Sequence, residues 1–398
     1  MSLVPGVHSS ISTVDNQVHA KLKRLISQGL SNSHIRAYDP ELRQSALLFA
    51  TRLGEIMDHF EPDQSDVGED GWTVPKNLAS WSNYFTFDVM SHLVFGTSYN
   101  LLTNSENHWV IDGVLGQMRR MSFLTMLPEL EDMRFDLLLF PGARRMAYQF
   151  AVKSREIMEA RKIREKAMEG QETKVDLFSK LLAAKDPETG EGLPDKQLWA
   201  ESNVMIIAGS DTSSTAIAAT LFYLSRNPSA YARVTKEVRS TITTPPRHLP
   251  GSKTALVHIS PCLYSRVNMP QPAGWRGCEI GTGIYAVHHN EEYYHDPLEF
   301  RPERWLADEV GDEAVAKAHS AFDAFSQGPR GCPGKSLALI EIPFALAAVI
   351  IGYDFRKVES SLGEVGEEKG KFAGQYQTSW AFSSLKDGPY LPFKRIKS

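Results

Sequence analysis

The sequence predicts a single, mainly α-helical domain with a minor β region. Apolar residues recur at helical spacing through most of residues 9–60, 75–165 and 195–226, and the breaks fall at prolines or turn residues. Strand-like patterns are confined to residues 278–300 and the C-terminal end. The chain has 398 residues, of which 42% are hydrophobic, so one large core can form. We therefore treat residues 1–398 as one domain, although length alone would allow two or three.

The first half of the chain is predicted to be a succession of helices. Residues 9–60 contain a break near Pro40, and residues 75–165 contain breaks at Pro128 and Pro141. Residues 154–168 mix charged and apolar side chains as an amphipathic helix does. Residues 185–194 form a turn-rich connector because they include a proline and a glycine.

The longest uninterrupted helix is predicted over Asp195–Arg226. Asp195 is a suitable N-cap, and the Asn227-Pro228 pair ends the pattern. At 1.5 Å per residue this helix would be roughly 48 Å long, about the width of a domain. We therefore expect it to cross the whole protein.

The remaining elements are shorter. Residues 280–288 predict a strand, residues 290–297 a turn, and residues 306–319 a charged helix. Residues 336–351 have helical character, and the chain ends in mixed strand and turn. By contrast, residues 241–277 contain six prolines and show neither helical nor strand periodicity for long. This is unusual for so long a segment inside a compact domain.

Composition excludes several functional classes. The 43 basic and 48 acidic residues give a net charge of −5 without long runs of one sign, so nucleic acid is not an expected partner. Three cysteines are too few for a disulfide scaffold and lack the spacing of a zinc site. The N-terminus does not resemble a signal peptide, and no stretch reaches the roughly 20 apolar residues of a membrane span. No transmembrane anchor is therefore expected in this chain.

The strongest chemical signal is a loop around Cys332. Residues 325–334 read Phe-Ser-Gln-Gly-Pro-Arg-Gly-Cys-Pro-Gly, directly before the helical residues 336–351. A helix N-terminus stabilises negative charge, so the thiol pKa should be lowered, and Arg330 adds a cation for an anionic ligand group. A thiolate suits a soft metal or haem iron, and Phe325 can shield its sulfur. The alternative is a buried structural cysteine in a Gly/Pro loop.

A second signal lies inside the long helix. Residues 208–212 read Ala-Gly-Ser-Asp-Thr, in which a mid-helix glycine costs roughly 1 kcal/mol relative to alanine. Buried polar residues in an apolar helix cost more. These residues could mark a helix end, but the apolar pattern continues on both sides. A local violation of this kind often marks a functional site.

Together these motifs resemble those of the cytochrome P-450 family. The loop matches Phe-x-x-Gly-x-Arg-x-Cys-x-Gly at every fixed position, and Asp211-Thr212 resembles the acid–alcohol pair of the family's central helix. The resemblance implies an incomplete P-450 fold that binds haem b, with Cys332 as the iron ligand and Arg330 on a propionate. It also implies a role for Thr212 in bonding the oxygen ligand and for Asp211 in relaying protons. The implied haem contacts further include Phe325, Gly328 and Gly334 in the loop and Ala208 and Gly209 in the helix, where Gly209 leaves room for dioxygen.

Two weaker matches extend the resemblance. Residues 300–305 read Phe-Arg-Pro-Glu-Arg-Trp, in which the family's pattern places Arg304 in a salt-bridge lock beneath the haem loop. Residues 19–23 read His-Ala-Lys-Leu-Lys, similar to the family's propionate-binding helix, so His19 and Lys23 become haem contacts. Lys23 replaces the usual arginine, which turns a bidentate contact into a point charge. A basic amphipathic face would explain the same residues.

The chain departs from the family in two places. It starts just before the propionate helix, so the usual anchor and first elements are not expected. The Glu-x-x-Arg pair should fall in residues 241–277, which contain no glutamate. A mis-spliced or frame-shifted gene model between residues 247 and 277 would explain this departure.

The resemblance implies a monooxygenase that inserts one oxygen atom from O2 into a hydrophobic small molecule, most similar to enzymes of secondary metabolism in filamentous fungi. Electrons would come from NADPH through a flavoprotein reductase, which Lys335 could help to dock. Relatives lie on the cytosolic face of the endoplasmic reticulum membrane. The alternatives are an inactive or haem-free remnant, a relative that rearranges peroxides, and, more remotely, a P-loop ATPase read from Gly334-Lys335-Ser336.

Overall fold

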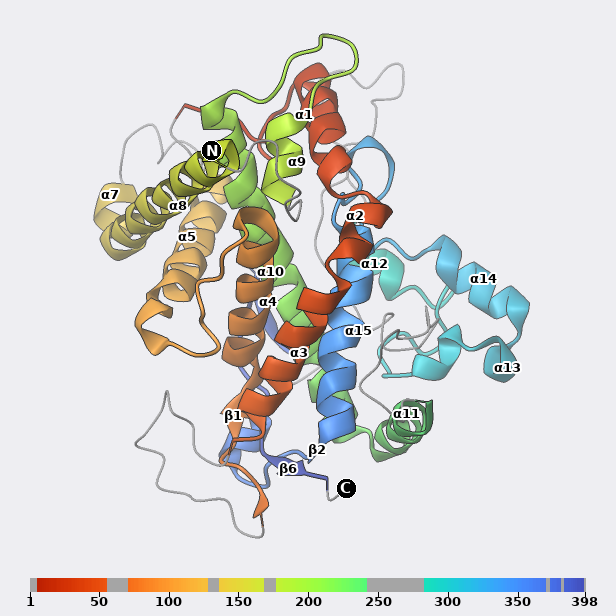
Figure 1. Cartoon of the computed structure of the whole chain (residues 1–398). Helices are drawn as coiled ribbons and strands as arrows, with labels where there is room; N and C mark the ends of the chain where they lie inside the picture. The colour runs from red at the N-terminus through yellow and green to blue at the C-terminus, as the bar shows by residue number, and fades with distance from the viewer. Residues whose placement is uncertain are drawn as a thin grey trace.

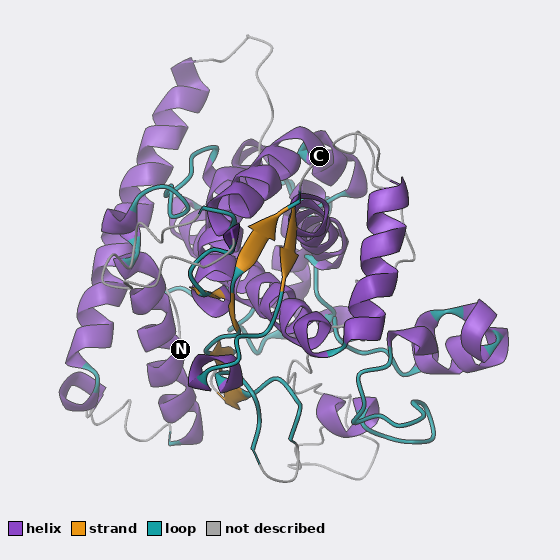
Figure 2. Ribbon diagram, turned by 90° about the horizontal axis from the view of Figure 1, so that it is seen from below, coloured by secondary structure: helices purple, strands orange, loops and turns teal. Residues whose placement is uncertain are grey.

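The computed structural model describes residues 6–55, 71–127, 136–167, 177–241, 283–369, 373–380 and 383–396. Helices dominate this part of the chain, with short antiparallel strand pairs at one end (Figures 1 and 2). The predicted mainly α-helical fold with a minor β region is confirmed. The proline-rich segment of residues 241–277 lies, apart from Thr241, outside the described residues.

The helices of the first half follow the predicted order. Pro40 lies in the first turn of α3, after a break at Tyr38, and Pro141 begins α8, because the missing proline N–H is tolerated at a helix start. The charged residues 154–167 form the C-terminal half of α8. The helices are α1 (Asn16–Gly29), α2 (Asn32–Ala37), α3 (Asp39–Leu53), α4 (Leu78–Phe95), α5 (Trp109–Met126), α7 (Asp136–Leu139), α8 (Pro141–Ala167) and α9 (Leu177–Ala183).

The central helix α10 spans Asp195–Arg226, as predicted, although its N-cap is Pro194 rather than Asp195. It packs most extensively against α4, and also against α15 (Lys335–Gly352), which itself lies along α3 (Figure 1). Ile206, Ile217 and Phe222 of α10 have no exposed surface. Burying such a side chain contributes about 1.5–3 kcal/mol, so α10 anchors the main core.

The strands form three two-stranded antiparallel sheets in the described residues. β1 (Lys76–Asn77) pairs with β5 (Tyr390–Leu391), and β2 (Tyr353–Phe355) pairs with β6 (Phe393–Arg395). β3 (Thr378–Trp380) and β4 (Ser384–Lys386) form a hairpin in which Thr378 faces Lys386. The predicted strands at the C-terminal end are therefore confirmed.

The predicted strand at residues 280–288 is wrong where the structure describes it. Ile284–His288 form the short helix α12, and Val287 N donates to Gly283 O at 3.1 Å. The Tyr285 and His289 rings stack at 3.8 Å, four residues apart on one helix face. A short apolar run is compatible with both helical and strand periodicity. Here the backbone hydrogen bond and the ring stacking favour the helix.

A small lobe precedes the cysteine loop. It contains α12, the 3₁₀ turn η4 (Pro302–Trp305), α13 (Ala307–Val310) and α14 (Asp312–Ser320), where the sequence predicts a charged helix. Its own core is centred on Tyr294, Ala318 and Ala321. Figure 1 shows α13 and α14 projecting away from the central helices. α11 (Pro228–Thr241) lies next to this lobe, where Arg233 forms an ion pair with Glu309 of α13 at 2.9 Å, and it also packs against α15.

Among the described residues, two helices, α10 and α15, are long and apolar enough to cross a membrane by length and composition alone. The apolar window of α10 is 83% buried and that of α15 is 50% buried inside the protein. The apolar composition of both helices is explained by their packing in the protein core, because core helices are rich in apolar residues.

Candidate active site

The loop that carries Cys332 is closed by backbone hydrogen bonds. Cys332 N donates to Phe325 O at 2.8 Å, and Gly331 N donates to Gly328 O at 3.0 Å. Gly328 adopts a φ of 68°, a left-handed conformation that favours glycine. The loop therefore turns back on itself and leads directly into α15.

The thiol of Cys332 experiences two opposing influences. Cys332 is an exposed residue, yet the protein around its sulfur raises the pKa of the thiol through desolvation. The N–H groups of Gly334 and Lys335 and the charge of Lys23 act in the lowering direction. The sequence predicts a net lowering, whereas desolvation is the larger influence in the structure. A coordinated metal would reverse this balance, because a coordinating thiol is deprotonated.

Helix α1 lies against this loop and brings the predicted cations to it. Lys23 Nζ donates to Pro329 O at 2.6 Å and to Gly331 O at 2.8 Å. The Arg330 guanidinium donates to Thr13 O at 3.0 Å. His19 is buried beside them, and burial, with Arg330 and Lys23 nearby, lowers its pKa. The structure thus joins the N-terminal and C-terminal motifs into one cluster.

Phe325 lies at the edge of the same cluster. Its ring is in edge contact with Phe322 at 6.3 Å, and Lys335 Nζ lies 5.7 Å from its centroid. A β-carbon at Gly334 would lie 3.8 Å from the Cys332 sulfur, so Gly334 keeps the backbone close to the thiol.

The middle of the central helix α10 is partly exposed only at the predicted site. Between Ala200 and Phe222 every residue is buried except Ala208, Gly209 and Thr212, which are half-buried. Their spacing places them on one face of α10. Thr212 Oγ1 donates to Ala208 O at 2.8 Å, so its hydroxyl is bonded to the helix itself.

Gly209 also has a packing role that the sequence did not indicate. A β-carbon at this position would lie 2.6 Å from the terminal methyl of Met90 on α4. The Met90 side chain therefore occupies the space that a β-carbon at Gly209 would need. Room for dioxygen at Gly209 stays a prediction.

Asp211 faces away from this open face, into a polar cluster. Lys386 Nζ lies 3.4 Å from its carboxylate, and the Ser383 hydroxyl donates to the same carboxylate. Lys386 also donates to Ser214 Oγ at 2.9 Å and to Asn83 Oδ1 at 3.1 Å. Asp211 and Thr212 are thus adjacent in sequence but diverge in space.

The comparisons with known proteins agree with this arrangement. The family model described as cytochrome P-450 matches residues 19–254 and 275–370. The chain belongs to the cytochrome P-450 family. The unmatched residues 255–274 lie inside the segment whose sequence departs from the family pattern.

Individual P-450 relatives cover nearly the whole chain. It is 66% identical to cytochrome P-450 monooxygenase apf7 of Gibberella fujikuroi, over 99% of this chain and 79% of the relative. It is 33% identical to cytochrome P-450 monooxygenase AKT7 of Alternaria alternata, over 99% and 78%. The solved cytochrome P450DA heme domain has a TM-score of 0.71 at 19% identity, over 97% of this chain and 79% of that one, which supports the fold. The chain is therefore an oxidoreductase of the P-450 monooxygenase class.

The residues of this P-450 suit a haem group. The donor set offers a thiol at a helix N-terminus with two backbone N–H groups directed at it, which is a soft ligand with charge support. Lys23, Arg330 and His19 supply positive or hydrogen-bonding groups for carboxylates beside it. The half-buried face of α10 offers small side chains, as a flat cofactor requires.

The structure also reveals a buried carboxyl group that the sequence analysis missed. Glu341 of α15 is 1% exposed, and neither carboxylate oxygen has a hydrogen-bond partner of good geometry in the described residues. Burial raises its pKa to about 8, with the nearby Ser213 of α10 acting in the opposite direction. A single acid inside the apolar run 336–351 is the signal that could have found it.

Arg304 does not form a salt bridge in the described part of the chain. Its guanidinium donates instead to the backbone carbonyls of Arg301, Asp296 and Glu299 at 2.9–3.0 Å. Burial lowers its pKa. The salt-bridge lock implied by the family pattern stays a prediction, since its other members would fall outside the described residues.

Proposed function

We propose that this P-450 binds haem b through Cys332 and inserts one oxygen atom from O2 into a C–H bond of a hydrophobic small molecule, in fungal secondary-metabolite biosynthesis. The observation that carries the proposal is the joining of α1 to the cysteine loop, which places Lys23, His19 and Arg330 around an exposed thiol. A buried structural cysteine would not need the two cations Lys23 and Arg330 beside its loop. The overall reaction converts R–H, O2, NADPH and a proton into R–OH, water and NADP⁺.

Each residue of the cysteine loop has a distinct task in this proposal. The Gly334 and Lys335 N–H groups hold the negative charge of the Cys332 thiolate. Lys23 and Arg330 would hold the propionates, because a carboxylate is a stronger acceptor than the backbone carbonyls that they now contact. When bound, haem supplies the oxygen activation, and the protein supplies orientation and protons.

The residues of α10 supply and position the protons. Thr212 lies on the half-buried face, where its hydroxyl donates to Ala208 O and can exchange this acceptor for another at the same place. The neighbouring residue, Asp211, provides a carboxylate that can accept a proton. This carboxylate contacts polar groups of the β3–β4 hairpin. Protons then move from the hairpin side of α10 to its open face.

Electrons come from NADPH through a flavoprotein reductase in this proposal. Lys335, exposed at the start of α15, lies on the side of the cysteine loop and gives the reductase a basic contact. We place the enzyme on the cytosolic face of the endoplasmic reticulum membrane, in accord with its family. The substrate is apolar because Val204, Met205 and Ile207 precede the open face of α10.

The test is an absorption spectrum of the reduced, carbon monoxide-bound protein. A red-shifted Soret band is expected for thiolate ligation by Cys332, and Cys332→Ser should lose it. Cys278→Ser, a substitution at another of the chain's three cysteines, is the control and should retain it. Absence of haem in the unsubstituted chain would contradict the proposal and favour a haem-free remnant. In that case, sequencing the transcript across residues 247–277 decides whether the gene model is at fault.

A further inference from the structure

Asp211 is held by a hairpin far away in the sequence. Its carboxylate contacts two residues from the β3–β4 hairpin, Ser383 and Lys386, and the Lys386 Nζ lies 3.4 Å from one oxygen. Both charged side chains are almost completely buried, with 1% of Lys386 and 7% of Asp211 exposed. A buried charge is stable only when it is paired and hydrogen-bonded.

The remaining hydrogen bonds of the lysine complete this pairing. Lys386 Nζ donates to Ser214 Oγ at 2.9 Å and to Asn83 Oδ1 at 3.1 Å. Ser214 Oγ in turn donates to Asn83 Oδ1 at 2.6 Å. An ammonium group has three donors, and three acceptors surround this one. Lys386 therefore fixes α4, α10 and the hairpin to one another at the level of Asp211.

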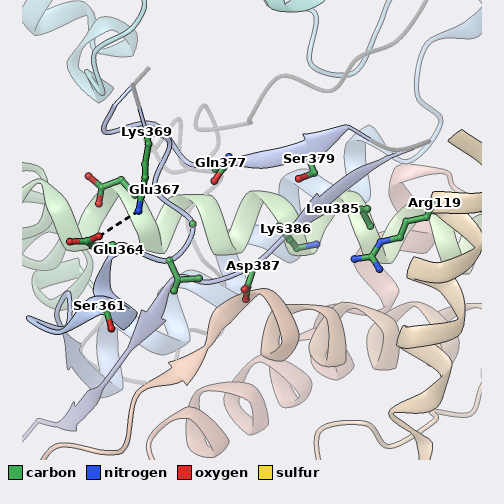
Figure 3. A pocket seen from close by; sticks show the side chains of 12 residues that line it. Arg119, Ser361, Glu364, Glu367, Lys369, Gln377, Ser379, Leu385, Lys386 and Asp387 are labelled. Atoms are coloured by element: carbon green, nitrogen blue, oxygen red, sulfur yellow. Dashed lines mark ion pairs between the residues drawn. The ribbon is translucent and has the colours of Figure 1, made fainter. Parts of the chain in front are cut away.

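Lys386 also lines a polar cavity that is open to solvent. It has a volume of about 640 Å³, and Figure 3 shows α5 and the hairpin strands around it. Besides Lys386, its lining includes charged and polar side chains from several elements, namely Arg119, Glu364, Lys369, Gln377, Ser379 and Asp387. A cavity of this size and polarity holds water. Lys386 thus borders this cavity and also contacts the Asp211 carboxylate.

We propose that Lys386 is a positioning residue for proton delivery, which holds the Asp211 carboxylate on the hairpin side of α10, next to the water of this cavity. The proposal rests on the proposed function, in which Asp211 relays protons to the open face of the same helix. Without the lysine, Asp211 would lose its only ion-pair partner in the described residues, and of its two hairpin contacts it would keep only the Ser383 hydroxyl.

The experiment needs no identified substrate. In haem-loaded protein with a flavoprotein reductase, substrate-free turnover converts O2, NADPH and one proton into H2O2 and NADP⁺, so each cycle takes protons from water. Lys386→Met is expected to slow NADPH oxidation about tenfold and to increase the solvent isotope effect in D2O. Lys386→Arg keeps the cation and should restore most of the rate.

Matched variants separate positioning from folding. Lys369 lines the same cavity, is 82% exposed and does not contact Asp211, so Lys369→Met should leave rate and isotope effect unchanged. A double-mutant cycle of Asp211→Asn and Lys386→Met in urea unfolding should show a coupling of about tenfold in the unfolding equilibrium constant. If Lys386→Met does not fold, Lys386→Gln replaces it in both measurements.

The two proposals fail differently. Wild-type rate and isotope effect in a folded Lys386→Met or Lys386→Gln variant would overturn the positioning role. Absence of haem in the unsubstituted protein would contradict the proposed function instead. The unfolding cycle needs no haem, and zero coupling between the two substitutions would overturn the pairing of Lys386 with Asp211 by itself.

Discussion

Glu341 gives the sharpest stability prediction, because its carboxyl group is buried among apolar residues of α15 without good hydrogen-bond partners in the described residues. Burial raises its pKa from the ordinary 4.5 to about 8. The unfolded chain therefore loses this proton at much lower pH than the folded protein does. We expect Glu341→Gln to remove the resulting pH dependence while preserving size and shape.

The sign and size follow from linkage. Below pH 4.5 both states hold the proton, so the group does not reduce stability there. As pH rises from 4.5 to about 8, only the unfolded state ionises, and stability is lost progressively. At 1.36 kcal/mol per pKa unit, the loss from this group between pH 5 and pH 8 is about 3 to 4 kcal/mol.

The assay is urea unfolding at pH 5, 6, 7 and 8. The stability difference between Glu341→Gln and the unsubstituted protein should grow with pH by about the amount above, in favour of the glutamine. Glu364→Gln is the control, because this side chain is 64% exposed, and it should show a constant difference. Parallel pH profiles for Glu341→Gln and the unsubstituted protein would refute the reasoning.

Three further predictions concern other parts of the described structure. Lys23→Met removes both hydrogen bonds to the cysteine loop, so the rate of haem transfer from this protein to apomyoglobin should rise about tenfold. Lys23→Arg keeps the positive charge and should leave this transfer rate nearly unchanged. Asp88→Ala leaves the buried N–H of Leu101, now bonded at 2.9 Å, without its acceptor, and should lower the unfolding free energy by about 2–3 kcal/mol; an unchanged urea midpoint would contradict this. Gly363→Ala would place a β-carbon 1.8 Å from the backbone oxygen of Val358, so thermal unfolding should show destabilisation of about 1–3 kcal/mol or more, and a neutral result would mean that the loop moves freely.

Much of the fold could be predicted because its signals are local. The bounds of α10 follow from an uninterrupted apolar pattern ended by Asn227-Pro228, and the structure reproduces them. Pro40 and Pro141 mark helix starts for a similarly local reason. The error at residues 284–288 arose because five residues fit both periods, so that only hydrogen bonding and ring stacking could decide.

For the candidate site, too, local features could be predicted from the sequence and long-range contacts could not. The sequence by itself determined the cysteine loop, because spacing in a continuous motif carries the chemistry of Cys332, and it determined the polar interruption at residues 208–212. Only the tertiary structure decided which groups surround these motifs. Lys386 meets Asp211 from 175 residues away, and Lys23 reaches Pro329 across 306 residues. Such contacts depend on how helices and hairpins pack, and no local pattern in the chain records the distance between them.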